Sequence, residues 1–506
     1  MQSDPSRTPS SVRSRWSRIA AGCALTAVLA GCGEPPSAPD VASEMPAHWR
    51  EAPQASAAEI GRDWVAGFGN AELTRLVDLA DLDSLDVAAA RARVEQAEAQ
   101  LAVTASGLMP TVGASGEASR SVSPGTNSSA TPPFTRRIGN SYQLGANASW
   151  QIDLWGATRA SVAAGEAGVA ASRLDLAAVR LSVATSIADA FFRAAAAEDR
   201  LRLARDNAAL AERTLAAIRR RFDVGTVTAL DVAQQESVVA SQRAAVPDLE
   251  ITLRQTRNSL VALTGRAPEA ASLRGGGLAR SRLPKVAPGL PARLLVRRPD
   301  VAAAERRLAA QAANVEAARA AFLPNVALTG SAGLSSAFLR NLLRPEAFAG
   351  SIASSVSETI FDGGAREGRL RLSRAQYDEL AADYRKTVHS ALTDVENALV
   401  AIEQNRRHET LQAAVVEAAL RAQRLTEQRL SEGTIPITTV LDAQRTLFQA
   451  QDTLVQVRLA RFRAAVDLIA ALGGGQSSAD PASAKVVASG TDTRSPMVLG
   501  GTDPRP

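Results

Sequence analysis

The chain has few of the residues that build metal centres and disulfide frameworks. Its 506 residues include two cysteines and three histidines. His48, His389 and His408 lack metal-ligand spacing, and neither an H-E-x-x-H pattern nor a glycine-rich nucleotide fingerprint occurs. We therefore expect no metal, no cofactor and no enzymatic activity.

Aromatic residues and net charge are also scarce. Aromatics make up 4% of the chain, and the formal net charge is +5, much of it from four arginines within residues 1–31. No dense basic run with interleaved aromatics occurs, so the sequence does not predict nucleic-acid binding. The hydrophobic fraction of 46% excludes a disordered chain, and the charged fraction of 22% excludes a bundle of membrane helices. The abundance of alanine favours long helices.

The N-terminus has the features of a secretory signal. Arginines at positions 13, 15 and 18 precede an apolar run over residues 19–31, which is too short for a permanent membrane helix. The run ends in Leu29-Ala30-Gly31-Cys32, which resembles the bacterial lipobox. This implies cleavage before Cys32 and acylation of its thiol to give a stable anchor, and Gly33 favours the outer membrane over the inner. The alternative is a soluble periplasmic protein with a chance cysteine.

The rest of the chain contains an internal repeat. Similar landmarks recur in the same order at nearly constant spacing, which indicates duplication of one unit. The matched segments are 105–110 with 319–324, 153–156 with 361–364, and 221–226 with 429–434, which lie 214, 208 and 208 residues apart. Each unit is predicted to contain a helix, two strands, a very long helix, a tight turn and a final helix.

Two segments of each unit alternate like β-strands. Residues 142–154 place apolar side chains at even positions and polar or small ones at odd positions, and residues 111–118 and 325–334 alternate similarly. Segment 348–361 is the weakest, because Glu358 interrupts its apolar face. A strand needs about 9–11 residues to span a bilayer, and these segments are long enough. A half-buried sheet in a soluble sandwich is the alternative, but the chain supplies no second sheet.

Two very long helices are predicted, from residue 157 to about 221 and from about 366 to 430. Apolar residues recur in both at spacings of three and four, as in a coiled coil. At 1.5 Å per residue, such a helix is about 95 Å long. Shorter partner helices are predicted near 81–107, 230–265, 299–321 and 438–472.

The number of strands requires an oligomer if the strands cross a membrane. Four strands cannot close a barrel, since about eight is the minimum. An open edge in lipid would leave backbone groups unsatisfied at several kcal/mol each. Two, three or four copies would supply eight, twelve or sixteen strands, and a channel that conducts more than water favours twelve or more.

Together these features resemble the TolC/OprM family of outer-membrane efflux channels, and within it the lipid-anchored, NodT-like branch. The resemblance covers roughly residues 64–472. Its motifs are the Cys32 lipobox, Trp64 with Phe68-Gly69-Asn70, Asp153-Leu154-Trp155-Gly156, Gly225-Thr226 with Leu230-Asp231, Leu295 with Arg297-Arg298-Pro299-Asp300, Phe322-Leu323-Pro324, Phe361-Asp362-Gly363-Gly364 and Leu441-Asp442-Ala443-Gln444-Arg445. It implies a mainly α-helical fold with a membrane β-barrel: a homotrimer in which four strands per chain form a 12-stranded barrel, continued by a long α-helical periplasmic barrel.

The resemblance also implies a domain organisation. Its parts are a lipoprotein signal peptide (1–31), an acylated linker and equatorial segment (32–80), the first repeat (81–265), a second equatorial segment (266–298), the second repeat (299–472) and a flexible C-terminal tail (473–506).

The function implied is the outer-membrane channel of a tripartite efflux pump, a passive duct that exports drugs or other small toxic molecules. Its partners would be outer-membrane lipids, a periplasmic adaptor and an inner-membrane transporter of RND type, which would supply the energy. It would reside in the outer membrane of a Gram-negative bacterium and extend into the periplasm. The alternatives are a lipoprotein adaptor, which would need one helical hairpin flanked by lipoyl-like β halves, and a structural coiled-coil lipoprotein, which would not explain the alternation at 142–154.

Three sets of site residues follow. By resemblance, the turns at Gly225-Thr226 and Gly433-Thr434 contact the adaptor. Asp231, Asp442 and Arg445 are candidates for the periplasmic gate, because rings of carboxylates in a narrow mouth bind or select cations. Asp442 and Arg445 could instead simply pair on the helix surface. Relatives often carry a second acid at the position of Thr439, which would give the gate two successive rings of carboxylates. This chain has threonine there and so departs from that pattern.

Aromatic residues near the strand ends are the third set. Tyr142, Trp150, Trp155 and Phe361 resemble the interfacial girdle of a membrane barrel. The alternative is ordinary core packing, and the sequence leaves both open.

Overall fold

The computed structural model describes residues 39–41, 45–52, 61, 63–123, 137–267, 276–284 and 286–475. The predicted signal peptide, Cys32, part of the loop at 121–140 and the tail beyond residue 475 lie outside the described residues. All helices and strands named below belong to the unit formed by residues 40–506.

The helices and strands repeat at the predicted spacing. The first repeat contains α3 (Leu85–Ser106), β1 (Thr111–Ser123), β2 (Arg137–Ile152), α4 (Ala157–Asp223) and α5 (Ala229–Leu263). The second contains α7 (Pro299–Ala320), β3 (Asn325–Ser336), β4 (Phe348–Ser357), α8 (Ala365–Ser431) and α9 (Ile437–Ala471). The equivalent helices have equal lengths: 22 residues for α3 and α7, 67 for α4 and α8, and 35 for α5 and α9. The internal duplication is therefore confirmed.

Short elements connect and flank the repeats. They are η1 (Trp64–Phe68), α2 (Ala71–Asp83), η3 (Leu278–Arg280), η4 (Pro291–Arg293), α6 (Leu294–Arg297), η5 (Leu339–Asn341) and η6 (Pro345–Ala347). α2 was not predicted from the sequence, and the predicted boundary between residues 80 and 81 falls inside this helix. Asn70 caps this helix, because its Oδ1 accepts hydrogen bonds from the backbone N–H groups of Glu72 (3.1 Å) and Leu73 (3.3 Å).

The four strands form one antiparallel sheet in the order β1-β2-β3-β4. The registers pair even-numbered residues with even-numbered residues, as in Leu144 opposite Leu334 and Trp150 opposite Leu328. Because side chains alternate along a strand, one face of the sheet is largely apolar and the other carries serine, threonine, asparagine, glutamine and glycine. The predicted alternation is confirmed.

The end of the fourth strand differs from the prediction. β4 ends at Ser357, so Glu358 and Phe361 lie beyond it rather than inside a strand over 348–361. Glu358 Oε1 accepts a hydrogen bond from Arg366 Nη1 at 2.9 Å, in the first turn of α8. The charged side chain is thus paired outside the sheet, and Glu358 does not interrupt the apolar face of β4.

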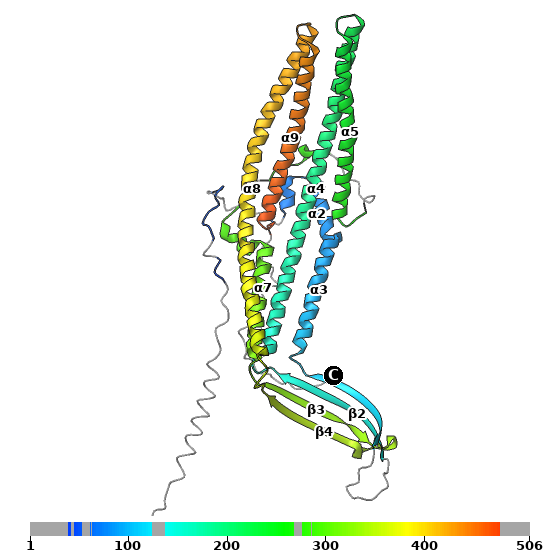
Figure 1. The fold of residues 1–506 in the computed structure, drawn as a ribbon, viewed down its shortest axis with the longest axis vertical. Helices are drawn as coiled ribbons and strands as arrows, with labels where there is room; N and C mark the ends of the chain where they lie inside the picture. Colours follow the sequence, from blue (N-terminus) through cyan, green and yellow to red (C-terminus); the bar gives the residue numbers. More distant parts are fainter. Residues whose placement is uncertain are drawn as a thin grey trace, which may run out of the picture. The chain divides into compact units, whose positions relative to one another are not determined.

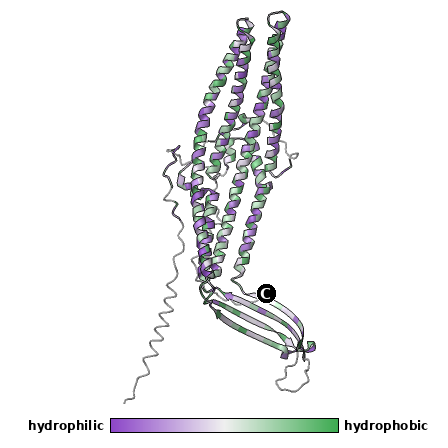
Figure 2. Ribbon diagram, viewed as in Figure 1, coloured by the Kyte–Doolittle hydropathy of each residue, from purple (hydrophilic) through white to green (hydrophobic). Residues whose placement is uncertain are grey.

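The long helices lie side by side, and the sheet is attached at one of their ends (Figure 1). Away from the sheet, the order across the layer is α8, α9, α4 and α5. The two repeats contact each other there through α4 and α9, and nearer the sheet through α4 and α7. Hydrophilic and hydrophobic residues alternate around each helix (Figure 2), as expected for amphipathic helices packed on one face. Within the described residues, no helix is both long and apolar enough to cross a membrane.

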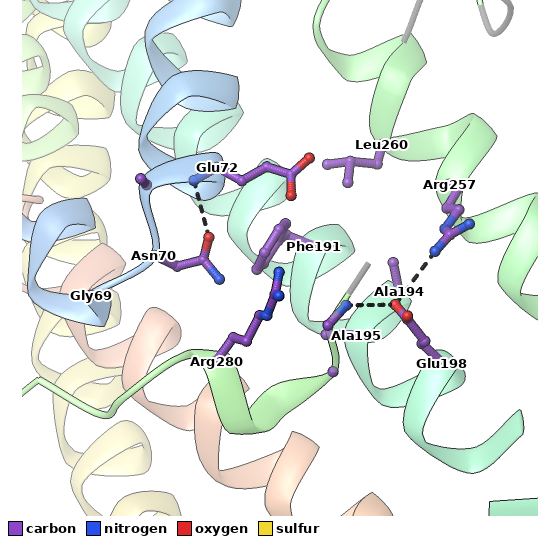
Figure 3. Close-up of a pocket in the computed structure, with 13 residues that line it drawn as sticks. Gly69, Asn70, Glu72, Phe191, Ala194, Ala195, Glu198, Arg257, Leu260 and Arg280 are labelled. Carbon is purple, nitrogen blue, oxygen red and sulfur yellow. Dashed lines mark hydrogen bonds and ion pairs between the residues drawn. The ribbon is translucent and has the colours of Figure 1, made fainter. Parts of the chain in front are cut away.

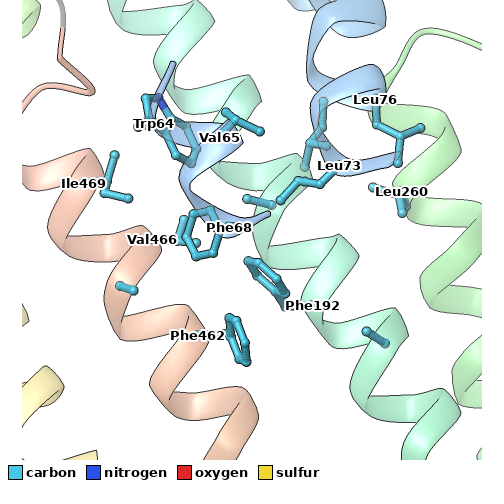
Figure 4. Packing of buried hydrophobic residues seen from close by; sticks show 14 of the residues in the cluster. Trp64, Val65, Phe68, Leu73, Leu76, Phe192, Leu260, Phe462, Val466 and Ile469 are labelled. Atoms are coloured by element: carbon cyan, nitrogen blue, oxygen red, sulfur yellow. The ribbon is translucent and has the colours of Figure 1, made fainter. Parts of the chain in front are cut away.

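The largest apolar core lies midway along the helices, where the segment at 64–83 crosses them (Figure 4). Phe68 of η1, Phe192 of α4 and Phe462 of α9 form its centre. The ring centroid of Phe192 lies 5.0 Å from that of Phe68 and 4.7 Å from that of Phe462. These aromatic contacts join the segment before the first repeat to one helix from each repeat.

Candidate functional site

Both helical hairpins reverse direction through the same motif, at the end far from the sheet (Figure 1). Gly225 follows α4 with φ of 75°, and Gly433 follows α8 with φ of 76°. In each turn the glycine N–H donates to the carbonyl three residues back, at 2.9 and 3.0 Å, and the next threonine N–H donates to the carbonyl five residues back, at 3.0 and 3.1 Å. This pair of bonds is the Schellman motif, which needs a left-handed residue and so favours glycine.

The two threonines add a further bond to these turns. Thr226 Oγ1 donates to the carbonyl oxygen of Arg221 at 2.9 Å, and Thr434 Oγ1 donates to that of Arg429 at 3.0 Å. A Cβ placed on either glycine would meet no atom within 4 Å. The requirement for glycine is therefore conformational, and the space beside each turn is open to a partner.

Arg221 joins the two hairpin ends, a contact that the sequence analysis missed. Its Nη1 donates to the carbonyl oxygen of Leu430 at 2.6 Å, and its Nη2 to that of Ser431 at 3.1 Å. The last carbonyls of a helix have no partner within that helix, and a cation is favoured there by the helix dipole. Arg221 of α4 thus caps the end of α8 and holds the repeats together at this end.

Asp231 is engaged by the start of its own helix. Its Oδ2 accepts hydrogen bonds from the backbone N–H and the Oγ1 of Thr228, both at 2.8 Å, while Thr228 Oγ1 accepts from the Asp231 N–H at 3.3 Å. These reciprocal bonds form a capping box at the N-terminus of α5. Asp231 therefore has a structural role in addition to the gate role that the sequence suggests.

We predict that Thr228→Ala will fray the first turn of α5. Loss of a threonine cap costs about 1 kcal/mol, within a range of about 0.5–2. Hydrogen exchange of the amides at the start of α5 should accelerate accordingly. Thr439→Ala is the matched control. Thr439 occupies the position in α9 that Asp231 occupies in α5, but the N-cap residue of α9 is Pro436, which forms no side-chain hydrogen bond, so α9 has no capping box to lose. Equal acceleration near both sites would contradict the capping role.

Asp442 and Arg445 form the expected pair on the surface of α9. Arg445 Nη1 lies 3.7 Å from Asp442 Oδ1, and each side chain is 75% exposed. An exposed ion pair of this kind contributes about 0–1 kcal/mol, so it does not fix the carboxylate. Asp442 is the sixth residue of α9 and Asp231 the third residue of α5, so the two acids stand at different heights along the hairpins.

Buried polar residues join the helices behind this pair, both between the hairpins and within the first one. Gln444, fully buried, donates from Nε2 to Thr214 Oγ1 at 2.9 Å, which links α9 to α4. Gln235, also fully buried, donates from Nε2 to the Ala211 carbonyl at 2.9 Å. Burial raises the pKa of nearby Glu427, while the positive charge of Arg213 acts in the opposite direction.

Three of the four predicted interfacial aromatics lie at or near the junction of sheet and helices: Trp150, Trp155 and Phe361. The fourth, Tyr142, lies within β2. Trp150 Nε1 donates to the Leu108 carbonyl at 3.0 Å, and Trp155 Nε1 donates to the Pro324 carbonyl at 2.7 Å. Trp155 is 46% exposed and Phe361 is 88% exposed. The two tryptophans thus attach the sheet to the chain around it, and a girdle remains a prediction.

A cavity of about 310 Å³ lies at mid-height between α2, α4 and α5 (Figure 3). Glu198 Oε2 accepts hydrogen bonds from the Gly276 N–H at 3.1 Å and from Arg257 Nη2 at 3.4 Å. The carboxylate and the guanidinium therefore satisfy each other where the chain after α5 meets α4. This arrangement is that of a structural contact.

Known proteins share this architecture. The family model described as outer membrane efflux protein matches residues 76–266 and 290–474, one match in each repeat. The chain belongs to the outer membrane efflux protein family. The prediction of an efflux channel is therefore confirmed at the level of the family, while the lipid-anchored, NodT-like branch remains a prediction.

Individual members of the outer membrane efflux protein family match over most of their length. The chain is 34% identical over 461 residues to the pyoverdine export outer membrane protein OpmQ of Pseudomonas putida, covering 90% of this chain and 97% of that protein. The outer-membrane channel OprN has a similar structure, with a TM-score of 0.80 at 28% identity over 87% of this chain and 98% of its own. The Neisseria gonorrhoeae MtrE outer membrane channel gives a TM-score of 0.78 at 29% identity, covering 88% and 98%.

Proposed function

We propose that three copies of the chain close a 12-stranded barrel in the outer membrane and form the passive duct of a tripartite efflux pump. The observation that carries the proposal is the four-stranded sheet, which has one apolar face, one polar face and two unpaired edges, β1 and β4. In lipid, such edges must be paired, and strands from neighbouring copies supply the missing backbone partners. The apolar face then meets outer-membrane lipid and the polar face lines the passage.

The helices continue this passage into the periplasm. Three copies contribute three pairs of hairpins, whose ends surround the inner mouth. Asp442 and Arg445 of each copy then form rings at that mouth, where carboxylates in a narrow, low-dielectric opening attract cations. Arg221 holds the two hairpins of each copy together, and the paired rings set the width of the gate. The chain itself performs no chemistry, and the energy comes from an inner-membrane transporter of RND type.

The hairpin ends are the docking site for a periplasmic adaptor. The open space beside Gly225 and Gly433 admits a partner's backbone close to the turns. The end of the first hairpin also exposes three apolar side chains: Phe222 at 45%, Val224 at 73% and Leu230 at 66%. Exposed apolar residues gathered at one turn support a protein contact.

The exported compounds are small molecules. Relatives at 30% identity are named as outer membrane proteins of toluene and antibiotic efflux pumps, and OpmQ is named for export of pyoverdine. An acylated Cys32 anchors each copy to the outer membrane beside the barrel. The proposal does not depend on one compound, because most side chains on the polar face are uncharged, with Glu117 as an acidic exception.

Conductance tests the proposal. We expect the purified protein to give stable single-channel steps in planar bilayers, and Asp442→Ala to raise the conductance or reduce the preference for cations. Glu417→Ala is the matched control, because Glu417 forms a similarly exposed pair with Arg421 on α8, 73% and 59% exposed. The absence of conductance steps from a sample shown to be monomeric would refute the proposed duct. An equal response from both variants would place the gate elsewhere.

A further inference from the structure

The contact between the two repeats has a counterpart that a single chain cannot complete. Within the chain, the long helix of the first repeat packs against the final helix of the second, α4 against α9. By the duplication, α8 corresponds to α4 and α5 corresponds to α9. These two helices lie at opposite edges of the layer (Figure 1). A second copy placed at the α8 edge would offer its α5 and repeat the α4–α9 contact.

We propose that Arg93 of one copy forms an ion pair with Asp383 of the next, repeating between copies the pair that Arg307 and Asp175 form within the chain. The inference rests on the proposed ring of copies and names the residues that join them. Arg307 of α7 donates from Nη2 to Asp175 Oδ1 of α4 at 2.6 Å. This bond links the second repeat to the first.

Both partners of that pair have same-charge counterparts. Arg307 is the ninth residue of α7, and the ninth residue of α3 is Arg93. Asp175 is the nineteenth residue of α4, and the nineteenth residue of α8 is Asp383. The paired helices have equal lengths, so the correspondence involves no gap.

The two counterparts are available for an intermolecular contact. Arg93 and Asp383 are both exposed. In the described part of the chain, neither side chain forms an ion pair. Their charges are opposite, so the edge formed by α3 on one copy and the edge formed by α8 on the next are complementary at this height.

The sheet predicts the same junction independently. The β1–β2 pair Thr111–Ser149 corresponds to the β3–β4 pair Asn325–Ser357, with the offsets of 214 and 208 residues seen in the helices. Carrying the β2–β3 register, in which Ile152 faces Val326, across to the next copy places Val356 of β4 opposite Gly116 of β1. Even residues again face even residues, so every side chain stays on its own face of the sheet.

At the inner mouth, a contact within the chain likewise has a counterpart between copies. Arg429 is the counterpart of Arg221, since each is the sixty-fifth residue of its 67-residue helix. Arg429 is exposed. The carbonyls that correspond to those of Leu430 and Ser431 belong to Phe222 and Asp223 of the neighbouring copy. In the ring, Arg429 caps the end of the next copy's α4 as Arg221 caps the end of α8.

Chemical cross-linking of two cysteine pairs tests the ion pair. An arginine and an aspartate in contact are too far apart at Cβ for a disulfide, which needs about 4 Å, so a short bismaleimide is the probe. Arg93→Cys with Asp383→Cys should give a covalent trimer on a denaturing gel. Arg307→Cys with Asp175→Cys is the matched control and should give a cross-linked monomer. The chain has cysteines only at 23 and 32, so the protein without added cysteines supplies the blank.

The outcomes separate the inference from the proposed function. A covalent trimer from the first pair, with monomer from the second, supports the inference. No intermolecular product in a sample whose native mass is that of a trimer would overturn the junction but leave the duct intact. A monomeric sample would overturn the proposed ring itself.

A charge exchange distinguishes an ion pair from mere proximity. Arg93→Asp alone places two acids at the junction and should lower the temperature at which the trimer dissociates. Arg93→Asp together with Asp383→Arg should restore it. Failure of the double variant to recover, with the trimer still formed by each single variant, would show that the two side chains do not pair.

Discussion

Phe192→Ala should destabilise the chain by about 3–5 kcal/mol, because it removes a fully buried aromatic ring and leaves a cavity. Phe192 is 0% exposed and contacts rings from two other segments, η1 and α9 (Figure 4), as well as the adjacent Phe191. Its centroid lies 5.0 Å from Phe68, 4.7 Å from Phe462 and 5.6 Å from Phe191. Truncation therefore loosens the segment before the first repeat as well as the α4–α9 contact.

The measurement is chemical unfolding of the detergent-solubilised protein, followed by helical circular dichroism. Phe361→Ala is the matched control, because Phe361 is 88% exposed and lies outside the strands and helices. We expect the control to change the free energy of unfolding by less than about 0.5 kcal/mol. Similar small losses for both variants would mean that the aromatic core does not hold the repeats together.

Leu144→Arg should destabilise the lipid-embedded barrel by about 2–4 kcal/mol per copy, since the residue lies at the middle of β2 on the apolar face. An arginine there places a charge near the bilayer midplane. The trimer should be lost, and less protein should reach the outer membrane.

Gln143→Arg provides the matched control for this experiment. Gln143 is the adjacent residue of the same strand and lies on the polar face, opposite Glu117 of β1 and Ser335 of β3. The charge then enters a water-filled passage, and the trimer should survive. The reverse result, with Leu144→Arg tolerated and Gln143→Arg disruptive, would show that the apolar face packs on protein and not on lipid.

The order and extent of the elements were largely predictable from the sequence. Alternation over 142–154 and apolar spacings of three and four in the long helices are strong signals, because a buried face repeats its apolar residues at the period of its own geometry. The end of β4 was not predictable in this way. Glu358 interrupts the alternation, but its pairing with Arg366 of α8 depends on a helix that begins seven residues later.

The site was predicted less completely than the fold. The turns at Gly225 and Gly433 follow from glycine beside threonine, and the structure places both at the hairpin ends. Thr228 and Asp231 have the spacing of a capping box, a local signal from which the cap could have been predicted, although the sequence suggested only a gate role for Asp231. The bonds of Arg221 to Leu430 and Ser431 join residues about 210 positions apart, so no local sequence pattern predicts them.

The most direct test of the central claim is a reconstruction of the full chain in lipid nanodiscs by single-particle electron microscopy. We expect three copies around one axis, a closed barrel of twelve strands within the lipid, and β4 of each copy paired with β1 of the next. A monomer, an open sheet, or strands lying outside the lipid would contradict the claim.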